Sequence, residues 1–296
     1  MNQTAPSRKA RRGWLGRLCL LLSLMLLFGS IGVIGTSAAP SVSFPDGSQT
    51  ARVYLDGKEI LPGECALINS VTYVPLRKFC NLFDNCKITW NATTNTATVK
   101  TDSLTLIAQT GALYITANGH YFYTVEKILN LNGTLYVPIR PLTRAFNASL
   151  KWNSATRATE VTSPKGVPAV AYASYKSDEV YWLSRIISAE AKGEPFKGQI
   201  AVGNVVLNRV ASSQYPNTIY GVIFDRKYGT QFSPVSFGTI YQKPTDSAVI
   251  AAKICLEGYT LSDEILFFYN PRIATTSWID RARPYAFTIG NHRFYK

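Results

Sequence analysis

Residues 178–210 read DEVYWLSRIISAEAKGEPFKGQIAVGNVVLNRV, and this pattern predicts two consecutive helices with a break at Gly193. Pro195 cannot continue the first helix but suits the start of the second, because proline lacks the amide hydrogen that a helix interior uses. Ser177 is a suitable N-cap for the first helix. These signals predict the limits of both helices.

One carboxylate lies inside this helical pair. Viewed down the helix, Glu190 lies about 20° from Leu183 and about 40° from Ile186, so it projects from the apolar stripe. Apolar surroundings disfavour the charged form and raise a carboxyl pKa, which is what a general acid requires. An equally open alternative on these residues alone is that the helix ends near residue 190 and leaves Glu190 half exposed. Glu194, beside Pro195, is expected to be structural.

The N-terminal segment, residues 1–38, has the organisation of an export signal. Five basic residues precede an apolar run at residues 18–34, and small residues follow. We expect cleavage after Ala38, followed by a leader at residues 39–51. The alternative is an uncleaved anchor, because a run of about 17 residues is at the short limit of a membrane span. The protein is therefore predicted to be exported, and any contact with a membrane is expected only through this segment.

The chain is basic without a basic cluster. It contains 31 Lys and Arg residues and 18 Asp and Glu residues, and loss of the signal leaves a net charge of +8. No run of basic residues interleaved with aromatics follows the signal, so nucleic acid is not an expected partner. A charge of this sign suits attraction to cell-wall polyanions. Ordinary surface charge is the alternative interpretation.

Cysteine and histidine usage limits the chemistry. Four cysteines follow the signal: Cys65, Cys80, Cys86 and Cys255. One disulfide among the first three is expected in an oxidising compartment, with the pairing left open. The chain has two histidines, His120 and His292, and no CxxC pair, which is too few ligands for the usual zinc sites. We therefore expect no metal and no cofactor, and we exclude a metallopeptidase.

Residues 52–162 contain an internal repeat with a period of about 62 residues. The sequence YVPLR at residues 73–77 returns as YVPIR at residues 136–140, and ITWN at residues 88–91 returns as LKWN at residues 150–153. Alternating apolar residues predict short strands, a helix and a hairpin in each copy. For the first copy the helix is expected at about residues 75–83.

The two copies, residues 52–101 and 102–162, resemble paired modules of exported bacterial wall proteins that are named after the N-terminal domain of copper amine oxidase. With one histidine in this region, a copper site that requires several imidazoles is excluded. The resemblance implies an attachment or spacing module. The aromatic residues expected in its core, rather than as sugar platforms, are Tyr54, Tyr73, Phe83, Trp90, Tyr114, Tyr136 and Trp152.

Residues 163–176 contain two prolines and one glycine and show no hydrophobic periodicity, so we predict that they form a linker. The second domain, residues 177–296, is predicted to be mainly helical, with a late hairpin that turns at Gly290 and Asn291. The expected fold class is α+β, with a β-rich duplicated module followed by a helical domain.

Seven separated motifs of the second domain resemble the catalytic domain of spore-cortex-lytic cell-wall hydrolases. They are SAEAKGEP at residues 188–195, GQIAV at 198–202, LNRV at 207–210, YPNT at 215–218, QFS at 231–233, YNP at 269–271 and IGNHRFY at 289–295. The resemblance implies a lysozyme-like fold that acts on peptidoglycan glycan strands, with Glu190 as the catalytic residue. It also implies lytic transglycosylation, in which Glu190 first donates and then accepts a proton. It makes Tyr269, Asn270 and Gln231 candidate substrate contacts.

Several alternatives remain open on the sequence. Asp225 and Asp280 are candidates to position a water for hydrolysis, which would make the protein a muramidase, and a non-catalytic wall-binding protein is a further interpretation. A thiol hydrolase built on Cys255 and His292 is disfavoured, because Cys255 lies in an apolar helix. The front module differs from the peptidoglycan-binding domain common in the family, so a role in spore cortex lysis during germination and one in wall remodelling are both open.

Overall fold

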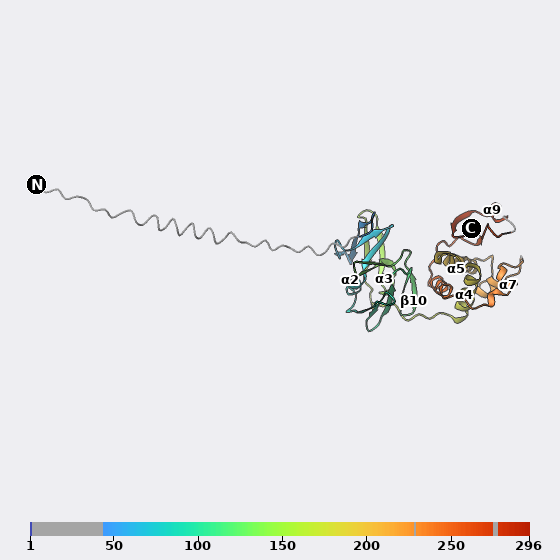
Figure 1. Ribbon diagram of the computed structural model, residues 1–296, viewed down its shortest axis with the longest axis horizontal. Coiled ribbons are helices and arrows are strands. Elements are labelled where there is room, and N and C mark those ends of the chain that lie inside the picture. Colours follow the sequence, from blue (N-terminus) through green and yellow to red (C-terminus); the bar gives the residue numbers. More distant parts are fainter. Residues whose placement is uncertain (2–43, 228, 275–277) are drawn as a thin grey trace. The chain divides into compact units, whose positions relative to one another are not determined.

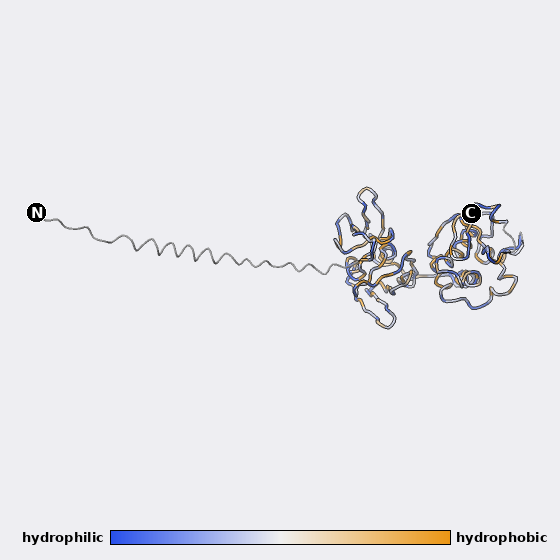
Figure 2. The backbone as a smooth tube through the Cα atoms, turned by 45° about the horizontal axis from the view of Figure 1, so that its top comes forward, coloured by the Kyte–Doolittle hydropathy of each residue, from blue (hydrophilic) through white to orange (hydrophobic). Residues whose placement is uncertain are grey.

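The computed structural model describes Met1 and residues 44–227, 229–274 and 278–296. The predicted export signal and the apolar run at residues 18–34 lie outside these residues. No helix in the described part of the chain is long and apolar enough to span a membrane. The α+β class is confirmed: a β-rich region precedes a mainly helical one that ends in a hairpin (Figure 1). Hydrophobic residues lie toward the interior of both regions, and hydrophilic residues follow the outer loops (Figure 2).

The two copies of the repeat meet in the central sheet of the β-module, residues 52–162. The sheet has the order β1 (Gln49–Thr50), β4 (Ala66–Ile68), β5 (Val71–Pro75), β12 (Thr134–Pro138) and β11 (Leu129–Leu131). The strands β5 and β12 carry the repeated YVP sequence and pair antiparallel, with Val74 opposite Val137. The end of the predicted leader is thus part of a sheet, through β1.

Each of these paired strands runs directly into a short helix, α2 (Leu76–Cys80) or α3 (Ile139–Ala145). The first helix ends three residues before the predicted limit. The chain turns after Cys80, and the Phe83 ring instead stacks on the ring of its repeat equivalent Phe146, with centroids 4.8 Å apart. Packing between the two copies therefore decides where this helix stops.

The other two sheets exchange strands between the copies. One has the order β10 (His120–Tyr123), β9 (Tyr114–Ala117), β8 (Thr105–Gln109), β7 (Thr96–Lys100) and β6 (Lys87–Asn91). The other has the order β13 (Ser149–Asn153), β14 (Ala158–Thr162), β2 (Arg52–Leu55) and β3 (Lys58–Ile60). The hairpin of each copy completes a sheet of the other copy. The duplicated segment consequently folds as one interlaced unit.

The aromatic residues predicted for the core of the β-module divide into two groups. Tyr73 and Tyr136 are 1% exposed. Trp90 and Trp152 are 44% and 45% exposed, so the core prediction is wrong for this repeated pair. Each tryptophan lies on the outermost strand of its sheet, β6 or β13, where a neighbouring strand covers one side only.

The four cysteines of the described residues are free thiols. Cys80 and Cys86 share a hydrogen bond, which raises the pKa of the Cys80 thiol and lowers the pKa of the Cys86 thiol. Burial raises the pKa of Cys65 to about 12. The expected disulfide is not formed in the structure, and Cys80 and Cys86 are the pair in contact.

The predicted linker is hydrogen-bonded to the β-module along its length. The Val170 amide donates to the Ala145 carbonyl and the Ala173 amide to the Asn118 carbonyl, both at 2.9 Å. The Asn118 side-chain amide donates in turn to the Val170 carbonyl at 2.8 Å. The segment contains no helix or strand, but these hydrogen bonds hold its backbone in a defined path.

Three helices form the centre of the helical region, residues 177–296. They are α4 (Ser177–Ala191), α5 (Phe196–Ala211) and α8 (Asp246–Leu256), and each packs against the other two. The three helices pack tightly at Gly203, where an added Cβ atom would lie 2.7 Å from the Cys255 sulfur and 2.9 Å from the Ile187 side chain. The Cys255 thiol is buried and donates to the Ile200 carbonyl at 3.4 Å, which fits a packing role.

Threonine hydroxyls cap the N-terminal ends of two helices. The Thr245 hydroxyl accepts from the Ala248 amide at the start of α8, and the Thr218 hydroxyl accepts from the Gly221 amide at the start of α6 (Ile219–Phe224). The predicted N-cap Ser177 is instead the first residue of α4, and no side chain caps that end.

The remaining elements surround these helices. They are α7 (Ser233–Ser236), the 3-10 turn η1 (Thr239–Tyr241), β15 (Phe267–Tyr269), α9 (Trp278–Ala282), β16 (Tyr285–Ile289) and β17 (His292–Tyr295). The strands form a small sheet in the order β15-β17-β16, which contains the predicted hairpin. Both α7 and η1 pack against α4, whereas β15 packs against α5.

Candidate active site

Glu190 is the second-to-last residue of α4 and lies where the helix is still regular. The helix ends one residue later, at Ala191, which agrees with the expected limit near residue 190, and the Lys192 amide still donates to the Ser188 carbonyl, so the backbone around Glu190 is helical. The Glu190 side chain is half-buried beside the apolar stripe that includes Ile186 and Ile187. Within the described residues no hydrogen bond or ion pair reaches its carboxylate. Desolvation by burial raises the pKa of Glu190 to about 7.

Glu194 lies one helical turn further along the chain and has two hydrogen-bond donors. Its carboxylate accepts from the Asn291 backbone amide at 2.8 Å and from the Asn291 side-chain amide at 3.0 Å. Burial acts to raise the pKa of Glu194, but these two bonds outweigh it and the pKa is lowered. Glu194 thus fixes the turn of the β16–β17 hairpin to the break between α4 and α5, which is the structural role expected for it.

The hairpin turn is shaped for this contact. Gly290 has a φ of +58°, which favours glycine, and a Cβ atom there would collide with the Glu194 carboxylate. His292 follows the turn and is buried against the Phe268 ring, with centroids 5.1 Å apart. Burial lowers the pKa of His292, although the nearby Glu194 acts to raise it. A buried imidazole with a lowered pKa is neutral at pH 7, which suits packing.

The three candidate substrate contacts have partners within the chain. The Tyr269 hydroxyl donates to Asp280, which also accepts from Tyr295. The Asn270 side-chain oxygen accepts from the Arg272 amide at 3.0 Å, and the Gln231 side-chain amide donates to the Gly229 carbonyl at 3.2 Å. None of the three contacts Glu190 directly in the described residues. Their elements nevertheless flank its helices, because β15 packs on α5 and the helix α7 that follows Gln231 packs on α4.

The other acids singled out from the sequence are engaged. Asp280 accepts two tyrosine hydroxyls and lies 3.8 Å from the Arg293 guanidinium, and the two hydroxyl bonds lower the pKa of Asp280. The Asp225 carboxylate accepts from the Lys227 amide at 2.9 Å. Glu190 therefore differs from these acids, because it is half-buried and no other residue in the described ranges forms a hydrogen bond or ion pair with its carboxylate. No group of three or more His, Cys, Asp or Glu side chains in the described ranges is placed to hold a metal ion.

Polar residues of α5 position the segment that leads into β15, and the sequence analysis assigned them no role. The Asn204 side chain donates to the Tyr259 carbonyl at 2.8 Å and accepts from the Leu261 amide at 3.0 Å. The Asn208 side chain donates to the carbonyls of Ser262 and Ile265, both at 2.9 Å. The sequence signal that could have indicated this role is the presence of polar side chains on an otherwise apolar helix.

Arg209 completes this support. It is 5% exposed, and its Nε atom donates to the Leu266 carbonyl at 2.8 Å. Its guanidinium lies 5.1 Å from the centres of the Tyr215 and Phe232 rings and 5.5 Å from that of Phe267. Burial lowers the pKa of Arg209. One buried cation therefore joins α5, the loop before α7 and β15.

Two sequence families match this chain in separate segments. The Cell Wall Hydrolase family matches residues 193–295, and the Copper amine oxidase N-terminal domain family matches residues 54–161. The C-terminal segment of the chain is thus similar to the cell wall hydrolases and the front segment to the amine oxidase module, which confirms both resemblances seen in the sequence.

Individual relatives agree with this assignment. The spore cortex-lytic enzyme of Bacillus cereus is 35% identical over 146 residues, which are 49% of this chain and 55% of the relative. That of Bacillus subtilis is 37% identical over 120 residues, which are 40% of this chain and 38% of the relative. The solved catalytic domain of the germination-specific lytic transglycosylase SleB from Bacillus anthracis is 35% identical and covers 45% of this chain and 99% of that domain, with a TM-score of 0.38. This chain spans about half or less of the curated relatives' length.

Proposed function

We propose that this protein is an exported enzyme that cleaves peptidoglycan glycan strands between N-acetylmuramic acid and N-acetylglucosamine, as a lytic transglycosylase with Glu190 as its acid and base. The observation that carries the proposal is the half-buried carboxyl of Glu190, which has no hydrogen-bond or ion-pair partner among the described residues and whose pKa is raised to about 7. A carboxyl with this pKa is protonated in a large fraction of molecules at neutral pH. The similarity to enzymes named for spore cortex lysis supports this substrate class.

The proposed reaction needs one carboxyl group. Protonated Glu190 donates its proton to the glycosidic oxygen, and the bond from that oxygen to C1 of the muramoyl residue breaks. The 6-hydroxyl of the same residue attacks C1, and its proton passes to the Glu190 carboxylate, which restores the acid. The products are a 1,6-anhydromuramoyl end and a new hydroxyl on the leaving sugar.

Hydrolysis by a muramidase route would require a second carboxylate near the bond. Asp225 and Asp280 are the sequence candidates, and both carboxylates already accept hydrogen bonds within the chain. This arrangement favours the intramolecular route.

We assign catalysis to residues 177–296 and wall association to residues 52–162, joined by residues 163–176. The action is placed outside the cell, at the wall or the spore cortex. Neither a metal nor a cofactor enters the reaction. Tyr269, Asn270 and Gln231 remain candidate substrate contacts. Their intramolecular hydrogen bonds leave the face of the Tyr269 ring, the second lone pair of the Asn270 oxygen and the Gln231 side-chain oxygen for a sugar.

Mass spectrometry of the soluble fragments released from purified cortex and vegetative peptidoglycan tests the proposal. Anhydromuramoyl ends that disappear with Glu190→Gln are the expected result. Reducing muramic ends would replace transglycosylation by hydrolysis. Release of no fragments from either substrate would contradict an enzymatic function.

A further inference from the structure

One face of the β6–β10 sheet of the β-module carries a hollow that the proposed reaction does not use. Its volume is about 210 Å³, and it lies across four neighbouring strands, β7 to β10. The cross-strand pairs Thr96–Gln109, Ile107–Thr116 and Thr116–Tyr121 place these side chains on one face of the sheet. The complete lining is Thr96, Ile107, Gln109, Ala112, Tyr114, Thr116 and Tyr121.

The lining combines aromatic rings with neutral polar groups. The Tyr114 and Tyr121 rings lie 5.6 Å apart at an interplanar angle of 37°, and Ile107 is 40% exposed. The Gln109 side-chain nitrogen donates to the Thr94 carbonyl at 3.0 Å, which orients the amide and leaves its oxygen as an acceptor. No lining residue is charged. A pyranose ring matches this chemistry, because it presents an apolar C–H face to an aromatic ring and hydroxyls at its edge.

The size of the hollow limits its ligand. Sites that enclose a drug-sized ligand measure roughly 300–1,000 Å³. A hollow of about 210 Å³ is below that range and suits one sugar ring of a longer strand. A strand that enters such a shallow site can continue on both sides of it.

The same face of the sheet, at its β9–β10 edge, packs against the helical region. The Tyr123 ring is 7% exposed, with its centroid 4.6 Å from that of Tyr259. The Tyr114 ring, which lines the hollow, lies 6.3 Å from the Phe196 ring. Phe196 is the first residue of α5 and follows the Glu194 turn directly. The hollow is therefore continuous with a contact to the helix that succeeds Glu190 in the chain.

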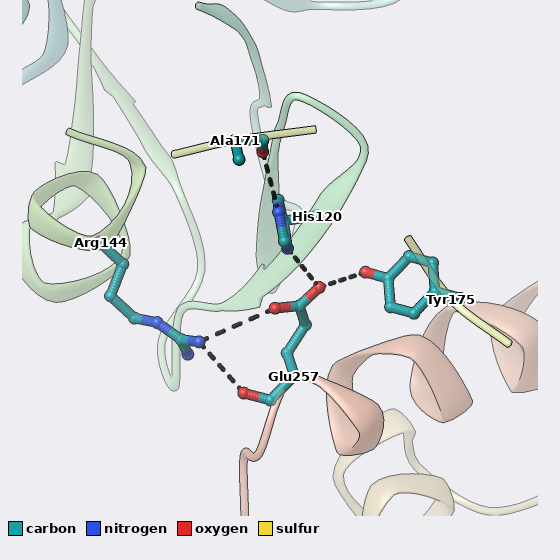
Figure 3. A network of polar contacts seen from close by, with 5 residues as sticks. All are labelled: His120, Arg144, Ala171, Tyr175 and Glu257. Atoms are coloured by element: carbon teal, nitrogen blue, oxygen red, sulfur yellow. Dashed lines mark hydrogen bonds and ion pairs between the residues drawn. The ribbon is translucent and has the colours of Figure 1, made fainter. Parts of the chain in front are cut away.

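One buried glutamate ties this edge of the sheet to the helical region (Figure 3). The side chain of Glu257, at the end of α8, is 9% exposed and accepts from the Tyr175 hydroxyl. It lies 2.7 Å from Nδ1 of His120, which is next to Tyr121 of the hollow. His120 Nε2 lies 3.0 Å from the Ala171 carbonyl, so each ring nitrogen has an oxygen within hydrogen-bonding distance.

Arg144 of α3 adds to the same junction. Its Nη2 atom donates to the Glu257 carbonyl at 3.1 Å and lies 3.8 Å from the carboxylate. Its guanidinium also lies 4.4 Å from the centre of the Phe122 ring on β10. The linker, α3, β10 and α8 thus converge on Glu257. Their contacts fix the distance between the hollow and the helical region.

We propose that the hollow is a carbohydrate subsite, which holds one sugar of the glycan strand that the helical region cleaves, and that the Glu257 junction fixes its position. The proposal rests on the proposed function for the identity of the strand. Binding at the hollow does not require catalysis, so the two can fail separately.

Binding is tested in the full chain with Glu190→Gln, which prevents cleavage, and with tetra-N-acetylchitotetraose as the probe. NMR spectroscopy follows the ring resonances of Tyr114 and Tyr121 during the titration. Ile107→Arg fills the hollow from an exposed position on β8, and we expect it to weaken the binding seen at these two rings about tenfold. Thr89→Arg is the matched control, because it places the same side chain on the same exposed face outside the hollow.

The proposal predicts saturable shifts of both tyrosines, with an affinity that Ile107→Arg lowers about tenfold and Thr89→Arg retains. Equal thermal unfolding of the two arginine variants shows that the loss is local. Unshifted tyrosine resonances, or equal affinity in the two variants, would overturn the subsite even if anhydromuramoyl products had been found.

The junction has its own test in the otherwise unaltered chain. Glu257→Gln removes the negative charge that His120 and Arg144 share but leaves every residue of the hollow in place. We expect tyrosine shifts like those of the parent and a several-fold slower release of fragments from insoluble peptidoglycan, with unchanged cleavage of short soluble strands. Equal release from insoluble peptidoglycan would contradict the role of the junction.

Discussion

Glu190 and Glu194 are one helical turn apart in the chain, and their surroundings give them opposite acidities. Both are shielded from water in part. Two donors from Asn291 reach Glu194 and lower its pKa, whereas no donor in the described structure reaches Glu190 and burial raises its pKa to about 7. The comparison teaches that the presence of donors, rather than burial alone, separates a structural carboxylate from a candidate acid.

The largest expected effect in this comparison is on the rate of strand cleavage. Glu190→Gln keeps the size of the side chain but removes the proton donor, and we expect the rate to fall by about 10²–10⁴-fold. The rate of fragment release from purified peptidoglycan measures it. Glu194→Gln is the matched control, and a comparable loss per folded molecule in that variant would contradict the distinction between the two residues.

Gly290 tests the steric basis of the Glu194 contact. Gly290→Ala introduces a Cβ atom that collides with the Glu194 carboxylate and strains a residue at a φ of +58°. We expect the free energy of unfolding to fall by roughly 1–3 kcal/mol, measured by urea denaturation. Gly258→Ala is a control with similar backbone strain but open space around the added atom, so a larger loss there would rule out the collision as the cause.

The pH dependence of cleavage follows from the raised pKa of Glu190. The acid must be protonated in the free enzyme, so kcat/KM is expected to fall above pH about 7, by about tenfold per pH unit. A rate profile between pH 5 and 9, on soluble strands, measures this limb. A profile that is flat across this range would show that a different group supplies the proton.

The smallest expected effect is on stability through Glu194. Because its pKa is lower in the folded than in the unfolded chain, Glu194 stabilises the fold above the ordinary value of 4.5, and this contribution is lost as the pH falls through the folded value. At pH 7, Glu194→Gln is expected to cost about 1 kcal/mol in urea denaturation, with a smaller difference at pH 3. A variant as stable as the parent at pH 7 would mean that the Asn291 bonds contribute nothing.

Local patterns were sufficient for much of the helical region. The Pro195 break and the turn at Gly290 each depend on neighbours in the chain. The orientation of Glu190 followed from helical geometry. Such features are set by short-range physics, and sequence reports them directly.

Features that depend on distant partners were not predictable in this way. The strand exchange of the β-module, the edge positions of Trp90 and Trp152 and the convergence of three segments on Glu257 all require knowledge of which elements meet. The role of Arg209 likewise depends on three aromatic rings from separate segments. Ser177 shows that even a local cap signal can be shifted by one residue.

The central claim is that Glu190 is an isolated carboxyl held near the pKa of a neutral-pH acid. Titration of the ¹³C-labelled glutamate carboxyls by NMR, with Glu190→Gln to assign the resonance, measures that pKa directly. The account predicts a value of about 7 for Glu190. A value near the ordinary 4.5 would contradict it, because the carboxyl would then be ionised before a substrate arrives.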